Sequence, residues 1–213
     1  MIRERLNLTK EKKMGMDVYG INPKIVGEQP KEPTNLYNGK EPKPTEKEIR
    51  AYYDSKEKFE EQNCGVYFRN NVWWWRPLAS FIFEKIQFKD WFSDEHAEAL
   101  ATNGGMEWTE EQALEIAQII EDAYTIGELD DREVKHKKKM KVAEEWNAKI
   151  DVELQKLRDK HKDIAPIDYP PEDKKKWDEL YETTDRYAHY PFSAENCMRF
   201  CKFLKECGGF KIC

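Results

Sequence analysis

The sequence predicts an α+β fold that is predominantly α-helical, with a small sheet of short strands packed by helices and a charged helical insertion. Three observations predict it. Short runs of β-forming residues next to glycines occur at 14–20, 66–69 and 210–213. Capping boxes and apolar residues at helical spacing fill most of the chain between these runs. Near residue 128 the composition changes from aromatic-rich to rich in lysine and glutamate.

The N-terminal part starts with a charged leader at residues 1–13, which we expect to be flexible. A first strand is expected at 14–20, where valine and tyrosine precede a glycine. Residues 21–44 contain five prolines, which predicts a long extended loop. Thr45 and Glu48 then form a capping box, so a helix starts there and runs toward the second strand.

The central part predicts one strand and three helices. Residues 66–69 form the second expected strand. Pro77 is expected in the first turn of a helix, where its missing N–H is tolerated. Ser93 is expected to cap a short helix. Thr109 and Gln112 form a second capping box, which starts the next helix.

The remainder of the chain is mostly helical. Residues 128–163 carry apolar residues at alternating three- and four-residue steps within a strongly charged stretch. This pattern predicts a long amphipathic helix, part of a helical hairpin or of a coiled-coil pair through which the chain could form a homo-oligomer. Three prolines end this helix, and another helix is expected at 172–184. Ser193 is expected to cap the final helix, and two glycines separate that helix from a last strand at 210–213.

These elements predict three parts of the chain. Residues 1–13 are the flexible leader, residues 14–127 and 186–213 form an aromatic-rich core domain, and residues 128–185 form a charged helical appendage. The division follows the change in composition near residue 128 and the prolines that close the insertion.

Composition excludes some classes of function. The formal net charge of -6 argues against a general nucleic-acid binder, which needs a basic surface to neutralise phosphates. No apolar run is long enough to span a membrane, so no membrane partner is expected. The five cysteines, without a secretory signal, indicate free thiols in a reducing cytoplasm.

The stretch VYFRNNVWWWRPL at residues 66–78 is the most distinctive part of the sequence. Three consecutive tryptophans cannot all point into one core, on a strand or on a helix. At least one indole must therefore meet another surface, a ligand or a partner. Arginine forks can grip phosphate or carboxylate, and asparagine amides can read a base edge or a ribose. The alternative is a hydrophobic nucleus whose extra tryptophan lies half-exposed under another helix.

This stretch and its neighbours give the candidate ligand-binding residues. Stacking on an indole favours a flat ligand, and the arginines favour an anionic one. The candidate residues are Tyr19, Tyr67, Arg69, Asn70, Asn71, Trp73, Trp74, Trp75 and Arg76.

No catalytic or metal site is identified. Serine and cysteine residues lack a histidine or acid at a recognisable spacing, and no phosphate-binding glycine loop is present. The spacings of Cys197, Cys201, Cys207 and Cys213 fit no common zinc motif, so neither a metal nor another cofactor is expected.

Three blocks of the chain together resemble a family of bacteriophage and prophage proteins. They are MGMDVYG (14–20), YFRNNVWWWRPL (67–78) and FSAENCMRFCKFLKECGGFKIC (192–213). The resemblance implies an accessory protein that acts in the cytoplasm of the infected host cell, and it implies no established activity. The chain departs from the family because its first block starts at Met14, which suggests Met14 as an alternative start. It also lacks the CxxC pairs carried by some members, so no zinc site is implied.

From these observations we expect a phage accessory protein that binds a small nucleotide-like or anionic ligand without turnover. Sequestration of a host signalling nucleotide is the use that the resemblance suggests. The alternative is a protein–protein interaction module that inhibits or modulates a host protein, with exposed aromatics as anchors. An enzyme is a third hypothesis, because acid–base residues need only meet in space.

Overall fold

The computed structural model describes residues 15–213. The flexible leader expected at residues 1–13 and the suggested start at Met14 lie outside the described residues. The chain divides into two compact units, of which the first runs to Ile126 and resumes at Glu195. The second unit spans Gly127–Ala194. Residues 186–194, which the sequence analysis assigns to the core domain, therefore belong to the second unit.

The first unit is built on a small antiparallel sheet, and with the surrounding helices this confirms the predicted α+β class. Within residues 15–213 the sheet has four strands in the order β2-β1-β4-β3. Their bounds are β1 (Gly15–Gly20), β2 (Tyr67–Asn71), β3 (Glu107–Trp108) and β4 (Phe210–Ile212). Three strands were predicted, and β3 was missed because two residues are too short to show an alternating pattern.

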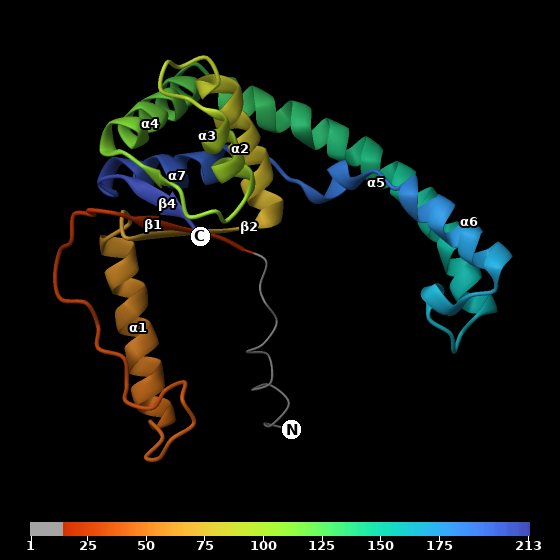
Figure 1. Ribbon diagram of the computed structural model, residues 1–213, viewed down its shortest axis with the longest axis horizontal. Helices are drawn as coiled ribbons and strands as arrows, with labels where there is room; N and C mark the ends of the chain where they lie inside the picture. Colours follow the sequence, from red (N-terminus) through yellow and green to blue (C-terminus); the bar gives the residue numbers. More distant parts are fainter. Residues whose placement is uncertain (1–14) are drawn as a thin grey trace. The chain divides into compact units, whose positions relative to one another are not determined.

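Helices cover one side of this sheet, and on the other side α1 extends away from it (Figure 1). Figure 1 shows α2, α4 and α7 on one side of the sheet and α1 on the other. The helix bounds are α1 (Glu46–Gln62), α2 (Val72–Ile86), α3 (Asp94–Ala101), α4 (Glu110–Thr125) and α7 (Ala194–Glu206). The capping boxes predicted at the starts of α1 and α4 are both present, at Thr45 and Thr109.

Helix α2 starts earlier than the sequence predicted. The side-chain oxygen of Asn71 accepts a hydrogen bond from the Trp74 N–H at 3.0 Å and caps the helix. Since this cap fixes the start at Val72, the prediction that Pro77 lies in the first turn is wrong. All three consecutive tryptophans consequently lie at the N-terminal end of a helix and not on a strand.

The core of the first unit lies between the sheet and helices α2, α4 and α7. The Trp75 and Phe200 rings meet edge to face, with centroids 5.6 Å apart. Trp108 stacks on Phe210 with centroids 5.2 Å apart. The largest fully buried side chains of this unit are Trp75, Trp108, Phe81, Phe200, Phe203, Phe210, Leu78, Ile82, Ile86, Ile116 and Ile120. These contacts anchor β2 and α7, the two elements that border the site described below.

A close backbone junction joins the end of β1, the start of β2 and the end of α7. A Cβ atom on Gly65 would lie 2.3 Å from the Glu206 carbonyl oxygen. A Cβ atom on Gly20 would lie 2.1 Å from the Gly65 carbonyl oxygen. Only glycine fits at both positions, and the junction sets where α1 ends beside the sheet.

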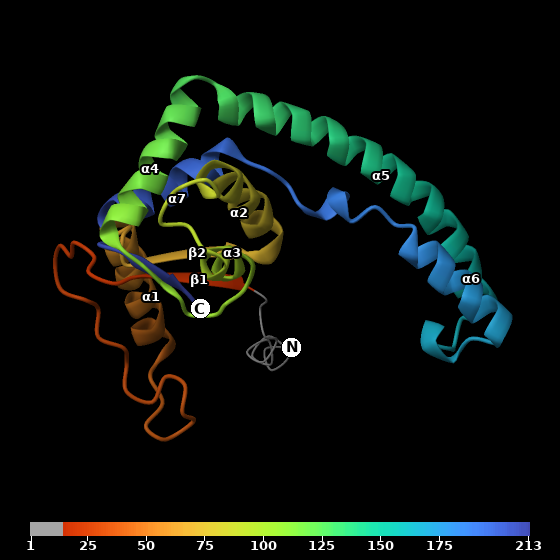
Figure 2. The same cartoon turned by 45° about the horizontal axis from the view of Figure 1, so that its top comes forward.

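The second unit is a helical hairpin with short 3-10 turns. Helix α6 lies along α5 in two views of the molecule (Figure 1, Figure 2). Its elements are α5 (Glu128–Lys160), η2 (Pro166–Asp168), α6 (Pro171–Glu182) and η3 (Arg186–His189). Asn147 exchanges hydrogen bonds with the backbone of Asp185 at 2.8 and 2.9 Å, and the indole N–H of Trp146 donates to the Thr183 carbonyl at 2.9 Å. These bonds fix the returning segment on α5.

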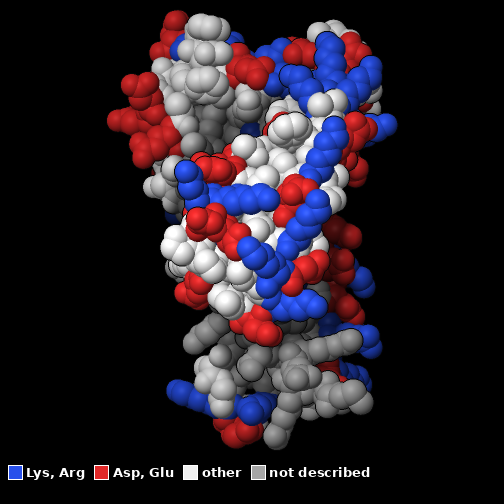
Figure 3. All heavy atoms as spheres, turned by 90° about the vertical axis from the view of Figure 1, so that its right-hand side faces the viewer, with Lys and Arg blue, Asp and Glu red and all other residues white. Residues whose placement is uncertain are grey.

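Charges of both signs alternate on the second unit. Figure 3 shows lysine and arginine side chains lying between aspartate and glutamate side chains on one of its faces. Lys160 and His161 both contact Asp173 at 2.7 Å, and Lys176 lies 3.9 Å from Glu153. The Lys176–Glu153 pair is exposed, and exposed ion pairs contribute little to stability. Across residues 15–213, no helix combines the length and the apolar character that crossing a membrane requires.

Candidate functional site

Three of the nine predicted site residues serve the fold. Trp75 is 1% exposed, and its indole N–H donates to the Leu100 carbonyl at 2.8 Å. The buried Asn70 amide donates to the side-chain oxygen of Asn196 at 3.0 Å. Asn71 caps α2. Trp75 and Asn70 therefore face the core and cannot contact a ligand at the surface.

Three others lie on the exposed side of α2. Trp73 is 40% exposed and Trp74 is 38% exposed, so two of the three indoles are only partly covered. Arg76 lines a shallow hollow of about 290 Å³ between α2 and α3, whose other lining residues are small or apolar. None of these three lines the groove that holds the remaining residues.

The remaining three, Tyr19, Tyr67 and Arg69, come together on the outer face of the sheet. Tyr19 is paired with Tyr67 across β1 and β2, and their ring centroids are 5.1 Å apart. Arg69 lies opposite Asp17, with its Nε atom 3.7 Å from the carboxylate. The Tyr67 hydroxyl donates a short hydrogen bond to the same carboxylate. Asp17 therefore holds the aromatic pair and the arginine in one row.

These three residues line a groove of about 970 Å³ along β2, here called the edge groove. One wall is formed by α1 and the other by α7, with β2 between them. The lining residues are Tyr19, Gln29, Lys56, Glu57, Glu60, Glu61, Cys64, Val66, Tyr67, Phe68, Arg69, Arg199, Lys202 and Phe203. Val66 and the first three residues of β2 are consecutive among them, so the groove follows the edge of the strand and not one face of it.

The hydrogen bonds of β1 leave this edge unpaired. Asp17 exchanges backbone bonds with Cys213, so the odd-numbered residues of β1 bond toward β4. Gly20 donates to the Val66 carbonyl, so the even-numbered residues bond toward β2. Bonded pairs alternate along an antiparallel ladder. Val66, Phe68 and Asn70 are therefore the residues of this stretch that bond to β1.

Tyr67 and Arg69 consequently turn their backbone groups away from β1. Within residues 15–213, nothing bonds to the N–H or the carbonyl of either residue. Two donors and two acceptors thus open into the edge groove. Free groups of this kind are a template for pairing with another extended chain.

The walls of the edge groove carry opposite charges. The α7 wall presents Arg199 and Lys202, both exposed. The α1 wall presents three glutamates and one lysine, and Lys56 lies 3.7 Å from Glu60. Among the described residues no ion pair joins the two walls. Their charges therefore face the space of the groove.

Two side chains of the edge groove have pKa values raised above their usual range. Burial raises the pKa of the Tyr67 hydroxyl above its usual range, and its bond to Asp17 raises it further. Burial also raises the pKa of the Cys64 thiol, with a further contribution from Glu206. Both groups stay protonated at neutral pH, and a protonated thiol is a weak nucleophile. Neither group is therefore an activated nucleophile.

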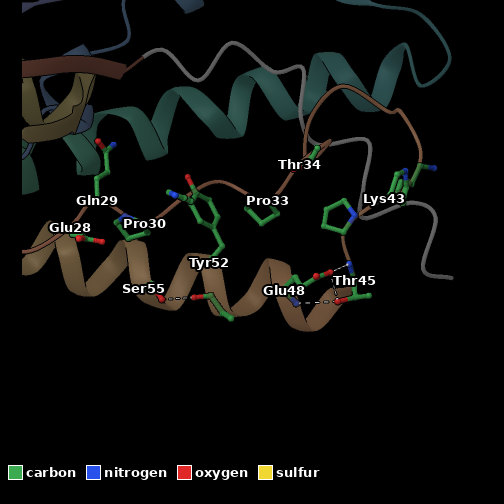
Figure 4. A pocket seen from close by; sticks show the side chains of 14 residues that line it. Glu28, Gln29, Pro30, Pro33, Thr34, Lys43, Thr45, Glu48, Tyr52 and Ser55 are labelled. Carbon is green, nitrogen blue, oxygen red and sulfur yellow. Dashed lines mark hydrogen bonds between the residues drawn. The ribbon is translucent and has the colours of Figure 1, made fainter.

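A second large hollow lies between the proline-rich loop and α1. It encloses about 1060 Å³, and Figure 4 shows Pro30, Pro33 and Tyr52 along it. At its end, the Glu48 carboxylate accepts from the Thr45 N–H and hydroxyl, both at 2.8 Å. The polar groups at the start of α1 are thus used in capping, and no predicted site residue lines this hollow. We therefore place the candidate site in the edge groove.

Sequence reasoning missed Arg199 and Lys202. Both lie in the final helix, which was predicted to start after Ser193, but its charged residues were assigned no role. They lie next to β2 because Phe200 and Phe203 pack on Phe68, with centroid distances of 5.0 and 5.9 Å. The spacing of these phenylalanines along α7 is the one signal that could have placed the two cations beside the strand.

Neither a metal centre nor a known relative identifies the site. Among residues 15–213, no group of three or more histidine, cysteine, aspartate or glutamate side chains is placed to hold a metal ion. The five cysteines form no disulfide. The chain matches no family model, no curated protein and no solved structure. An inference about function therefore rests on the geometry of the edge groove.

Proposed function

We propose that this protein is a non-catalytic interaction module that binds an extended segment of another protein as an additional strand on β2. The observation that carries the proposal is the unpaired backbone of Tyr67 and Arg69, which opens into a groove of about 970 Å³. Strand addition is a recurrent way to bind peptides, in which main-chain bonds give affinity and side-chain contacts give specificity.

The magnitudes fit a moderate affinity. Each new main-chain hydrogen bond contributes about 0.5–1.5 kcal/mol net, so four such bonds contribute a few kcal/mol. Ordering a flexible segment opposes this gain. The walls of the edge groove must therefore supply the rest through contacts with side chains of the segment, such as Tyr67 and Phe203 can make.

The expected partner belongs to the host of a phage. The resemblance of three sequence blocks to bacteriophage and prophage proteins supports an accessory role in the cytoplasm of an infected cell. Of the two functions expected from the sequence, the geometry supports the protein–protein module better. Trp75 and Asn70, which were expected to bind a small ligand, face the core instead. The edge groove replaces the tryptophans as its binding surface.

A small planar anion is the second candidate ligand. It is favoured by the aromatic pair of Tyr19 and Tyr67, which lies beside Arg69 in the same groove as Arg199 and Lys202. A nucleotide-like ligand could stack on one ring and place a phosphate near the cations. The three glutamates on the α1 wall oppose a highly charged anion and place this candidate second.

The strand-addition proposal is tested at a single backbone N–H. Arg69→Thr removes the charge and keeps the N–H, whereas Arg69→Pro removes both. Proline is tolerated on an edge strand when its missing N–H faces away from the sheet. We expect heptapeptides selected from a random library to bind the wild type and Arg69→Thr, with protection of the Tyr67 and Arg69 amides from hydrogen exchange. Arg69→Pro should fold, but it should bind these peptides about tenfold more weakly. The proline ring removes the N–H that bonds to the added strand and clashes sterically with that strand.

Tyr67→Thr and Tyr67→Pro repeat the comparison at the other free residue. Equal binding by the proline and threonine variants at both positions would contradict strand addition.

The second candidate is tested by titrating the wild type with cyclic and linear nucleotides. Binding that requires Tyr19 and Arg199 but tolerates proline at position 69 would favour the planar anion.

A further inference from the structure

We propose that the bound segment alternates in charge, with acidic side chains toward α7 and basic side chains toward α1. This inference rests on the proposed strand addition and names the chemistry of the partner. It follows from two features of the edge groove: the pleat of β2 and the opposite charges of the two walls.

The pleat decides which wall each side chain of an added strand meets. Successive side chains of a strand point to opposite faces of the sheet, and directly opposed residues share a face. Phe68 points to the inner face, where it packs on Phe200 and Phe203 of α7. Tyr67 and Arg69 point to the outer face, the side of the sheet on which α1 lies (Figure 1). Alternate residues of an added strand therefore face α7 and α1 in turn.

The α7 wall carries two positive charges, Arg199 and Lys202. The Arg199 guanidinium lies over the Phe68 ring, 5.8 Å from its centroid, and Lys202 lies one turn further along α7. Within the described part of the chain, neither residue forms an ion pair. An acidic side chain on the inner face of the added strand would meet both cations.

The α1 wall carries the opposite charge. Of its three glutamates, Glu60 is paired with Lys56 at 3.7 Å. Glu57 and Glu61 form no ion pair with any described residue. Arg69, which shares the outer face, is already paired with Asp17 at 3.7 Å. A lysine or arginine on the outer face of the added strand would meet the Glu57 and Glu61 carboxylates.

The two walls together select against ligands of a single sign. A polyanion such as a nucleic acid would be attracted by Arg199 and Lys202 and repelled by Glu57 and Glu61. A segment with acidic and basic residues at alternate positions satisfies both walls at once, because only an extended chain separates the two signs by face. The partner is therefore an extended protein segment in which acidic and basic residues alternate.

Two heptapeptides of equal composition test this pattern. The peptide TEKEKET places all its glutamates on one face and its lysines on the other. The peptide TEEKKET places both signs on both faces, and a shift of register cannot separate them. We expect TEKEKET to bind the full-length protein about fivefold more tightly at low salt, because two exposed ion pairs together contribute about 1 kcal/mol. The preference should weaken in high salt.

Charge reversal on α7 tests whether the α7 wall causes the preference for TEKEKET. The double variant Arg199→Glu and Lys202→Glu should remove the preference for TEKEKET. The matched control is Lys47→Glu and Lys58→Glu, which changes net charge equally at two exposed positions of α1 that do not line the edge groove. This control should keep the preference.

The outcomes separate this inference from the proposed function. Equal binding of the two peptides, or a preference that survives reversal of Arg199 and Lys202, would overturn the charge pattern. If library-selected peptides still protect the Tyr67 and Arg69 amides in that case, strand addition stands and only the charge pattern is wrong. If those amides gain no protection from any peptide, strand addition is wrong as well.

Discussion

Three adjacent tryptophans have different environments at the start of α2. Trp75 is enclosed between α2, α3 and α7 and donates its indole N–H to the Leu100 carbonyl. Trp73 and Trp74 remain 40% and 38% exposed. A helix places neighbouring side chains about 100° apart, so Trp75 can enter the core while the two tryptophans before it face outward.

Substitution should separate these roles. We expect Trp75→Ala to lower the free energy of unfolding by about 3–5 kcal/mol, since it leaves a large cavity and an unpaired carbonyl. Trp74→Ala should lower it by about 1 kcal/mol, as is typical of partly exposed residues. Urea denaturation at one pH measures both. Similar losses for the two variants would contradict the assignment of Trp75 to the core.

The candidate site was partly predictable at this scale. The argument that three indoles cannot share one core is confirmed by Trp73 and Trp74. The role of Asn70 was not predictable, because its partner is Asn196, 126 residues away in the sequence. Arg199 was missed for the same reason: only folding brings α7 beside β2.

The elements that frame the edge groove, α1, β2 and α7, meet at a junction where their backbones are in close contact. Gly65 lies between α1 and β2, against the carbonyl of Glu206 at the end of α7. Helices were predicted well from their capping residues, because a cap is a local signal. The start of α2 was not, since the Asn71 cap competes with the signal from Pro77.

Gly65→Ala should disturb this junction. The added Cβ would lie 2.3 Å from a backbone oxygen that cannot rotate away, so we expect a loss of stability of about 1–3 kcal/mol. Peptide binding in the edge groove should weaken too, since α1 must move relative to β2. The control is Gly104→Ala, whose Cβ would meet only the rotatable Thr102 hydroxyl at 3.3 Å. Thermal unfolding that is the same for both variants would count against the junction.

Two compact units make up the described chain, and each has its own buried residues. The first contains the sheet and the edge groove. The second contains α5 and α6, with a small core that includes Ala143, Ile150 and Leu154. The composition change near residue 128 signalled the start of the second unit. Its end was harder to place, because η3 and the residues after it carry aromatics that resemble the core composition.

We expect the first unit to fold without the second. Replacing residues 127–194 by a short glycine–serine linker should leave a cooperative thermal transition and the binding of library-selected peptides. The reason is that the sheet, its helices and the edge groove all belong to the first unit. Circular dichroism and the peptide titration measure the outcome, and a broad, non-cooperative transition would refute it.

The position of α1 and α7 beside the unpaired edge has a consequence for solubility. An open sheet edge exposes a protein to edge-to-edge pairing with the sheets of other copies, and so to aggregation. The sheet of a second copy would have to bring its own flanking helices, which a groove walled on both sides does not admit. A single flexible segment has no flanking helices, so it can enter the groove. The same two helices that would grip a partner segment thus protect the folded protein from polymerising through β2.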